Sequence, residues 1–165
     1  MHQLAALCLE RIGPAAKAAV PALATVINNN DGESRGAGPD SACVAAARAI
    51  WKIDNQTNIA AQVFKATLNS SDAHTRGWAA IYLTEIQPDD PSLIPILIEL
   101  LQGKDLGLQM SAASVIGKYH TDALAAVPEL LKIIDAPRPN PELRRRALAS
   151  LKMIDPIAAA KYEHP

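Results

Sequence analysis

One block of residues recurs along the chain, and this repetition restricts the possible folds more than any other feature. In each copy a small pair, usually Ala-Ala, is followed by an apolar residue and, three positions later, by another. The copies begin at residues 5, 46, 79, 112 and 147, so they lie 41, 33, 33 and 35 residues apart. Their members are Ala5-Ala6-Leu9-Ile12, Ala46-Ala47-Ile50-Ile53, Ala79-Ala80-Leu83-Ile86, Ala112-Ala113-Ile116-Tyr119 and Ala147-Leu148-Leu151-Ile154. A period of this size predicts an array of stacked structural repeats.

A second block follows the first at a constant offset and places a proline near the start of an apolar segment. It reads Val20-Pro21-Ala22-Leu23, then Ile94-Pro95-Ile96-Leu97, then Val127-Pro128-Glu129-Leu130, whereas residues 61–64 lack the proline. Proline suits the first turn of a helix, where its missing N–H would have no helical partner. Each repeat is therefore predicted to be a pair of helices, one near the proline and one that carries the Ala-Ala block.

Composition supports an all-α fold. The chain contains 31 Ala, 18 Leu and 15 Ile but only 4% aromatic residues. Alanine favours helix strongly, and few stretches alternate apolar and polar residues as half-buried strands do. We expect about nine helices in an α-solenoid of four to five helical hairpins that forms one array over residues 1–165. A long loop from Asn28 to Pro39 accounts for the 41-residue spacing.

The two blocks resemble HEAT-like repeats, in particular the short repeats of phycobilisome-lyase-like proteins. The matching segments are Ile12-Gly13-Pro14, residues 19–23 (Ala-Val-Pro-Ala-Leu) and residues 126–130 (Ala-Val-Pro-Glu-Leu). The resemblance covers nearly the whole chain and implies a superhelix, but it is almost silent on function. The residues typical of tetratricopeptide and ankyrin repeats are absent.

The resemblance also implies an Asp in the turn and an Arg early in the second helix, which stack into ladders between repeats. Asp72 and Arg76 match both positions. The other repeats carry His2, Cys43, Gln109 and Arg144 at the Arg position, and Asp40 (one residue displaced), Asp105 and Asn140 at the Asp position. We therefore expect an interrupted ladder.

Residues 2–13 form half a repeat, because no partner helix precedes them. An array end normally needs a polar face, whereas this segment carries Leu4, Leu7, Cys8 and Leu9. We expect the chain to be part of a longer solenoid. A short array with an imperfect cap, or a dimer that hides this end, remains an alternative.

No motif indicates catalysis or a cofactor. The four histidines are scattered, no phosphate-binding glycine motif is present, and we expect no metal or cofactor site. Cys8 is predicted to pack in the core, and Cys43 to be more exposed. With no signal peptide or membrane-length apolar run, a cytoplasmic location is expected. The net charge of −1 gives no support to nucleic-acid binding.

The resemblance implies that the Ala-block helices line the concave side, and helical spacing then predicts which of their residues face outward. Basic residues predominate among them, with apolar ones between. We call the following residues the predicted row: Arg11, Arg48, Trp51, Lys52, Ile81, Glu85, Met110, Lys118 and Arg145. Trp51 is either a partly exposed interface anchor or a packing residue. The row is either a groove for an acidic or amphipathic partner segment or an ordinary solvated face.

These observations favour a non-catalytic protein–protein interaction or scaffold module. An accessory subunit of a phycobilin-lyase-like enzyme is one alternative, although no residue can be named as catalytic. A HEAT-like nucleic-acid-binding protein is another. The sequence identifies neither the partner nor the oligomeric state.

Overall fold

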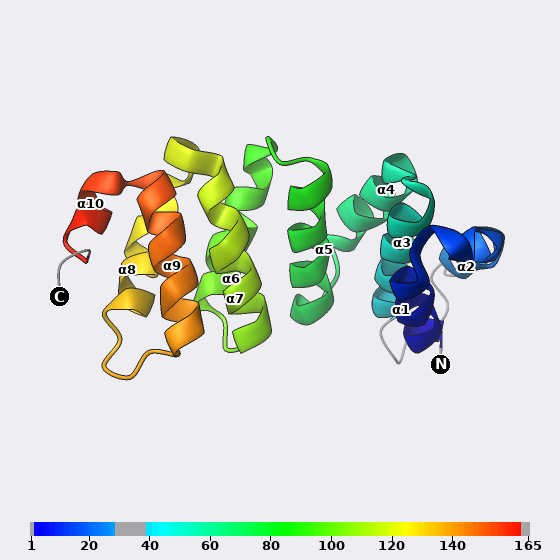
Figure 1. The fold of residues 1–165 in the computed structure, drawn as a ribbon, viewed down its shortest axis with the longest axis horizontal. Coiled ribbons are helices and arrows are strands. Elements are labelled where there is room, and N and C mark those ends of the chain that lie inside the picture. The colour runs from blue at the N-terminus through cyan, green and yellow to red at the C-terminus, as the bar shows by residue number, and fades with distance from the viewer. Residues whose placement is uncertain (1, 29–38, 163–165) are drawn as a thin grey trace. The chain divides into compact units, whose positions relative to one another are not determined.

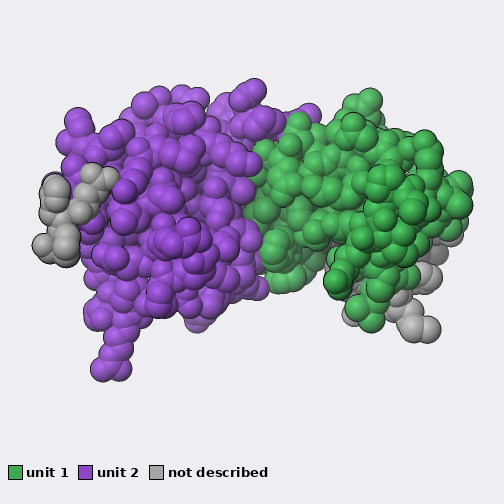
Figure 2. All heavy atoms as spheres, viewed as in Figure 1, with its two compact units in different colours: residues 1–86 green, residues 87–165 purple. Residues whose placement is uncertain are grey.

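The protein is described by a computed structural model that covers residues 2–28 and 39–162 (Figure 1). Over these two ranges the ordered elements are all helical, which confirms the predicted all-α class. Residues 29–38, which make up most of the predicted loop from Asn28 to Pro39, lie outside the described residues. The chain divides into two compact units, residues 1–86 and 87–165 (Figure 2). The single array over residues 1–165 stays a prediction.

Residues 1–86 hold five α-helices and one 3₁₀ helix in the described part of the unit. They are α1 (His2–Ile12), η1 (Gly13–Ala19), α2 (Val20–Asn28), α3 (Pro39–Asp54), α4 (Thr57–Thr67) and α5 (Ala73–Ile86). The helix α3 is the centre of this unit, because it packs against α1, α2, α4 and α5. Consecutive helices also pair, α2 with α3 and α4 with α5.

Residues 87–165 repeat this pairing. Their described elements are η2 (Pro91–Leu93), α6 (Ile94–Gln102), α7 (Leu106–Val115), η3 (Ile116–Ala126), α8 (Val127–Ile134), α9 (Pro141–Ile154) and α10 (Pro156–Ala160). Here α6 packs with α7 and α8 with α9, and α9 also contacts α7, η3 and α10. Within each unit, the Ala-block helices α3, α5, α7 and α9 thus pack on the helix before them and on a neighbouring Ala-block helix.

The helix boundaries follow the sequence signals. Pro21, Pro95 and Pro128 are each the second residue of their α-helix, as predicted. The first helix ends at Ile12, and Gly13 follows it with φ of 69°, a left-handed conformation that glycine adopts without steric cost.

Side chains at equivalent repeat positions cap the helices. The Asp position of the resemblance supplies N-caps: Asp72, Asp105 and Asn140 accept backbone N–H groups of Thr75, Leu108 and Leu143 at 2.9–3.0 Å. The Arg position supplies donors to carbonyl oxygens at or near the end of the preceding helix. Its contacts are Cys43 Sγ to Val26 (3.8 Å), Arg76 Nη1 to Ser70 (2.9 Å), Gln109 Nε2 to Leu101 (3.0 Å) and Arg144 Nε to Ile134 (3.2 Å). These bonds give both positions a role within each repeat, because they satisfy backbone groups that helix ends leave unpaired.

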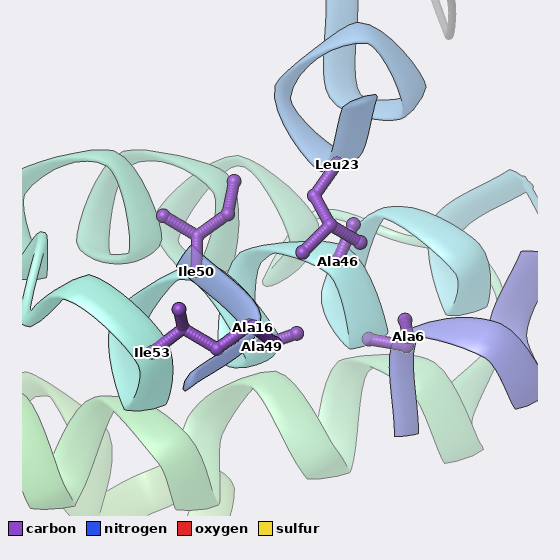
Figure 3. Packing of buried hydrophobic residues seen from close by; sticks show 8 residues of the cluster. Ala6, Ala16, Leu23, Ala46, Ala49, Ile50 and Ile53 are labelled. Atoms are coloured by element: carbon purple, nitrogen blue, oxygen red, sulfur yellow. The ribbon is translucent and has the colours of Figure 1, made fainter. Parts of the chain in front are cut away.

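The core of residues 1–86 consists mainly of small side chains around α3. Figure 3 shows part of it, with Leu23 of α2 beside Ala46 of α3. Ala49 and Ile50 are fully buried, and Ala6 of α1 is 1% exposed. Alanine at these positions lets the helices approach closely, whereas the branched residues fill the remaining space.

The block position held by Leu9, Ile50, Leu83, Ile116 and Leu151 is predicted by the repeat period to lie in the core, and the structure confirms this in four of five copies. Ile50, Leu83, Ile116 and Leu151 are at most 1% exposed. Leu9 is only half-buried. It packs at the edge of the cluster around α3 rather than inside it.

One element departs from the predicted pattern. The fourth Ala block was expected to form one helix through Tyr119, but α7 ends at Val115 and the chain continues as η3. Inside η3 the backbone bends at His120, which has φ of 45° and ψ of −132°. Three other repeats turn here with an X-Pro dipeptide, whereas this one has His120-Thr121.

Candidate interaction surface

The predicted row is divided between the two units. Residues 1–86 contain Arg11, Arg48, Trp51, Lys52, Ile81 and Glu85, and residues 87–165 contain Met110, Lys118 and Arg145. Each set is therefore described by itself.

Arg48 is held in a fixed position on α3. Its Nη2 lies 2.8 Å from Oε1 of Glu10 on α1, and its Nη1 donates a 2.8 Å hydrogen bond to the hydroxyl of Tyr82 on α5. The guanidinium carbon also lies 4.7 Å from the centroid of the Tyr82 ring. Arg48 thus connects three helices, with 30% of its side chain still exposed.

Lys52 is paired as well. Its Nζ lies 3.2 Å from Oε2 of Glu85 and 3.8 Å from the centroid of the Trp51 ring. Trp51 is half-buried, so its ring both packs and remains partly accessible. An exposed ion pair contributes about 1 kcal/mol or less to stability. The main consequence is electrostatic: both cations of α3 in the predicted row face a carboxylate.

Ile81 does not face outward, and this prediction is wrong. The residue is 4% exposed. The reason is that α5 presents buried residues on most of its circumference, including Thr75, Gly77, Ala79 and Leu83. Ile81 therefore lies on the buried part of α5, while His74 and Glu85 of the same helix are exposed.

An aromatic stripe on α5 lies next to Arg48. His74, Trp78 and Tyr82 follow one another at four-residue spacing, which places them on one face of the helix. Trp78 stacks on Tyr82 with ring centroids 5.7 Å apart, and its indole N–H donates a 3.1 Å hydrogen bond to Nε2 of His74. Phe64 of α4 packs against Tyr82 at 5.5 Å between centroids. The stripe is therefore rigid, with Trp78 and Tyr82 both half-buried.

These side chains border a cavity of about 190 Å³ between α1, α3 and α5. We call it the aromatic groove. Its walls are Leu7 of α1, Val44 and Arg48 of α3, and His74, Trp78 and Tyr82 of α5. Burial raises the pKa of the Tyr82 phenol even though Arg48 acts in the opposite direction, so this hydroxyl stays protonated. No acceptor among the described residues takes the Tyr82 hydroxyl hydrogen, which leaves a donor beside the groove.

Only Arg48 of the predicted row borders the aromatic groove. Glu10, His74, Trp78 and Tyr82 were missed. The four-residue spacing of the three α5 residues was a detectable signal, since histidine, tryptophan and tyrosine on one helix face are rare in a chain so poor in aromatics. Glu10 gave no such signal, because its partner lies on another helix.

In residues 87–165, one residue of the predicted row faces a carboxylate. Arg145 is exposed, and its Nη2 lies 2.7 Å from Oε1 of Glu142, which also pairs with Arg146 at 2.6 Å. Hydrogen bonds from Arg145 and Arg146 lower the pKa of Glu142 to about 2. Met110 is half-buried and Lys118 is exposed. None of these three residues lines either of the two cavities described in this subsection.

A second cavity, of about 370 Å³, lies between α2, α3 and α4. Cys43, Thr67 and Ser70 line it together with apolar side chains. The two cysteines have the opposite environments from those predicted: Cys8 is exposed and Cys43 is buried. The reason is the repeat position of Cys43, which faces the end of α2 and hydrogen-bonds Val26.

Other classes of site find no support in the described residues. No three His, Cys, Asp or Glu side chains in residues 2–28 and 39–162 come close enough together to hold a metal ion. None of the described helices combines the length and the apolar character that crossing a membrane requires. Comparison with known protein families, with curated proteins and with solved structures gave no match to this chain.

Proposed function

We propose that the chain is a non-catalytic protein-interaction module of HEAT-like repeats, and that the aromatic groove in residues 1–86 binds a segment of a partner protein. The observation that carries the proposal is the contact of Arg48 with Tyr82 next to the Trp78 ring. Tryptophan, tyrosine and arginine are the residues most enriched at the energetic centres of protein interfaces. Here all three are half-exposed and border one cavity.

The size of the groove supports a protein segment as the ligand. Pockets for small molecules usually measure about 300–1,000 Å³, whereas this cavity measures about 190 Å³. It suits one or two inserted side chains. Because Glu10, Phe64 and His74 already hold the walls in place, little side-chain entropy is lost on binding.

The ion pairs of α3 favour one of the two partner types that the sequence left open, an acidic or an amphipathic segment. Arg48 and Lys52 face Glu10 and Glu85, so the surface is not a strongly positive strip. We therefore propose an amphipathic partner segment that inserts an apolar side chain against Leu7 and Trp78. Beside that side chain it places a carbonyl or carboxylate oxygen, which accepts the Tyr82 hydroxyl hydrogen.

The same pairing gives nucleic-acid binding no support, since phosphate contacts need cations whose charge is not already met by carboxylates. No observation favours the lyase-like alternative over protein binding. The HEAT-like architecture itself rests on the sequence period, the consecutive helix pairs and the caps at equivalent positions.

Site-specific photo-crosslinking tests the proposal. A benzoylphenylalanine placed at His74, on the edge of the aromatic groove, is expected to capture a partner in an extract of the source cells. The matched control carries the same group at Lys65, an exposed residue of α4. A partner captured equally from both positions, or from Lys65 alone, would contradict the proposal that the aromatic groove is the binding site.

Binding measurements with the captured partner then separate the contributions of Trp78 and Tyr82 to the affinity. Trp78→Ala is expected to weaken binding about 30-fold, as loss of an aromatic anchor does. Tyr82→Phe keeps the ring but removes a hydrogen bond, and about a fivefold loss is expected. Lys65→Ala should leave the affinity unchanged. Parental affinity in both groove variants would disprove the proposal.

A further inference from the structure

His74 holds the ring of Trp78 in place at the edge of the aromatic groove. The indole N–H of Trp78 donates a 3.1 Å hydrogen bond to Nε2 of His74, and the two rings meet edge to face with centroids 6.2 Å apart. Both side chains line the groove. An indole has a single N–H group, so this bond uses the whole hydrogen-bonding capacity of the Trp78 side chain.

The bond depends on the charge of His74. An imidazole nitrogen accepts a hydrogen bond only when it carries no proton, so the contact requires the neutral ring with its hydrogen on Nδ1. Histidine is the side chain that ordinarily changes charge between about pH 5 and 8. Once Nε2 is protonated, two N–H groups would face each other, and the hydrogen bond to Trp78 is lost.

The charged groups around His74 in the described part of the chain keep their charge over this pH range. They are Asp72 in the turn before α5, Arg48 of α3 on the wall of the groove, and Glu10 of α1, which pairs with Arg48. Hydrogen bonds from Thr75 lower the pKa of the Asp72 carboxyl, to which His74 contributes less. Carboxyl and guanidinium groups ordinarily change charge outside this range.

The other elements packed on α5 leave the charge at this end of the groove unchanged. The α4 residue that contacts the aromatic stripe is Phe64, which is uncharged, and burial raises the pKa of the Tyr82 phenol, which stays protonated. Arg76 donates to a carbonyl oxygen of the turn that precedes α5. Lys52 and Glu85 pair with each other toward the end of α5. The charge of the groove therefore changes at His74.

We propose that His74 makes the aromatic groove sensitive to pH: the neutral imidazole fixes Trp78 for the partner segment, and the imidazolium releases it. This inference rests on the proposed function, because it assigns a control to the same groove. A ring that is fixed before binding loses less side-chain entropy than a mobile one, and we expect the partner to bind about fivefold more tightly at about pH 7.5 than at about pH 5.5.

The indole N–H signals of the free protein test the hydrogen bond without any partner. In a two-dimensional nitrogen–proton spectrum, the Trp78 signal is expected to move upfield as the pH falls from about 7.5 to about 5.5, because its N–H loses an acceptor. Trp51 is the internal reference, since its ring contacts Lys52. Its signal should stay in place, and Trp51→Phe assigns it.

His74→Gln separates the charge from the contact. The side-chain oxygen of glutamine accepts a hydrogen bond but does not titrate, so the Trp78 signal of this variant should not change over the same pH range. The matched control is His120→Gln, because His120 is an exposed histidine of residues 87–165. That variant should show the same Trp78 titration as the parent. Both variants should keep the helical circular dichroism of the parent.

Affinity for the captured partner tests the consequence for binding. The parent and His120→Gln should each bind about fivefold more weakly at about pH 5.5 than at about pH 7.5. The affinity of His74→Gln should be the same at both pH values.

The inference is overturned if the Trp78 signal does not respond to pH, or if it responds equally in His74→Gln. Equal affinity of the parent for its partner at both pH values would also overturn it. Failure of the aromatic groove as the binding site gives a different result, because Trp78→Ala would then bind the partner like the parent at about pH 7.5, whatever the indole signal shows.

Discussion

The backbone of Gly117 lies so close to Ser150 that a Cβ at position 117 would be 2.7 Å from the Ser150 hydroxyl oxygen and 3.0 Å from its Cα. The contact joins η3 to α9, and Ser150 also donates a hydrogen bond to Ala113. Residue 117 occupies the repeat position that holds Trp51 in an earlier copy. The close approach of α9 therefore leaves no room for a larger side chain at residue 117.

Gly117→Ala is expected to lower the free energy of unfolding by about 1–3 kcal/mol, because the new methyl group must displace the backbone of α9. Urea denaturation measures the change. Ala149→Ser, on the exposed side of α9, is the control and should change stability by less than about 0.5 kcal/mol. Parental stability of Gly117→Ala would show that the two helices separate without cost.

Leu83→Ala tests the core of residues 1–86. Leu83 is 1% exposed, and removal of a large side chain at such a site costs about 2–5 kcal/mol. The same substitution at Leu124, which is 51% exposed, serves as the control and should cost much less. Similar denaturation midpoints for the two variants would mean that Leu83 is not a core residue.

Glu142 is expected to make stability depend on pH. Hydrogen bonds from Arg145 and Arg146 lower its pKa from 4.5 to about 2 in the folded protein. The folded state therefore binds this proton less readily than the unfolded state, and the carboxylate stabilises the fold above pH 4.5. This contribution disappears as the pH falls from 4.5 toward 2.

Glu142→Gln provides the measurement. The variant should be less stable than the parent at about pH 6, and the difference should shrink steadily below about pH 4.5. Arg145→Gln is the companion variant and should move the loss to higher pH, because one of the two donors is gone. A stability difference that stays constant from about pH 6 to pH 2 would refute the assignment.

Sequence periodicity was sufficient to predict most of the α-helices, because the residues that start and end a helix are close to one another in the sequence. The proline blocks placed the starts of three helices, and Gly13 marked the end of the first. The turn at His120 was missed, since its left-handed backbone conformation occurs at a residue that carries no turn signal.

The surface was harder to predict, because it depends on which residues of different helices meet. Sequence spacing identified Arg48 and Lys52 as cations but not the carboxylates opposite them, which are contributed by other repeats. It placed Ile81 outward by analogy with its repeat neighbours, although α5 is buried on most sides. It also exchanged the environments of Cys8 and Cys43, because burial depends on the neighbouring helix and not on the apolar character of a residue's own helix.

The pair of Arg48 and Glu10 allows a test of how the aromatic groove is held together. Glu10 is 13% exposed as a side chain, and its Oε2 is buried without a hydrogen-bond partner in the described structure. Arg48→Met would leave this carboxylate without the cation that faces it. Removal of one member of a largely buried pair costs more than removal of both, because the remaining charge is uncompensated.

We expect Arg48→Met to lower the free energy of unfolding by about 2 kcal/mol, less than for a fully buried pair because Arg48 is partly exposed. Combining it with Glu10→Gln should restore at least half of this loss, since the neutral amide needs no counter-charge. Denaturation of the two single variants and the double variant completes the cycle. Additive losses in the double variant would show that the two side chains do not interact, and that α1 is held against α3 by apolar packing alone.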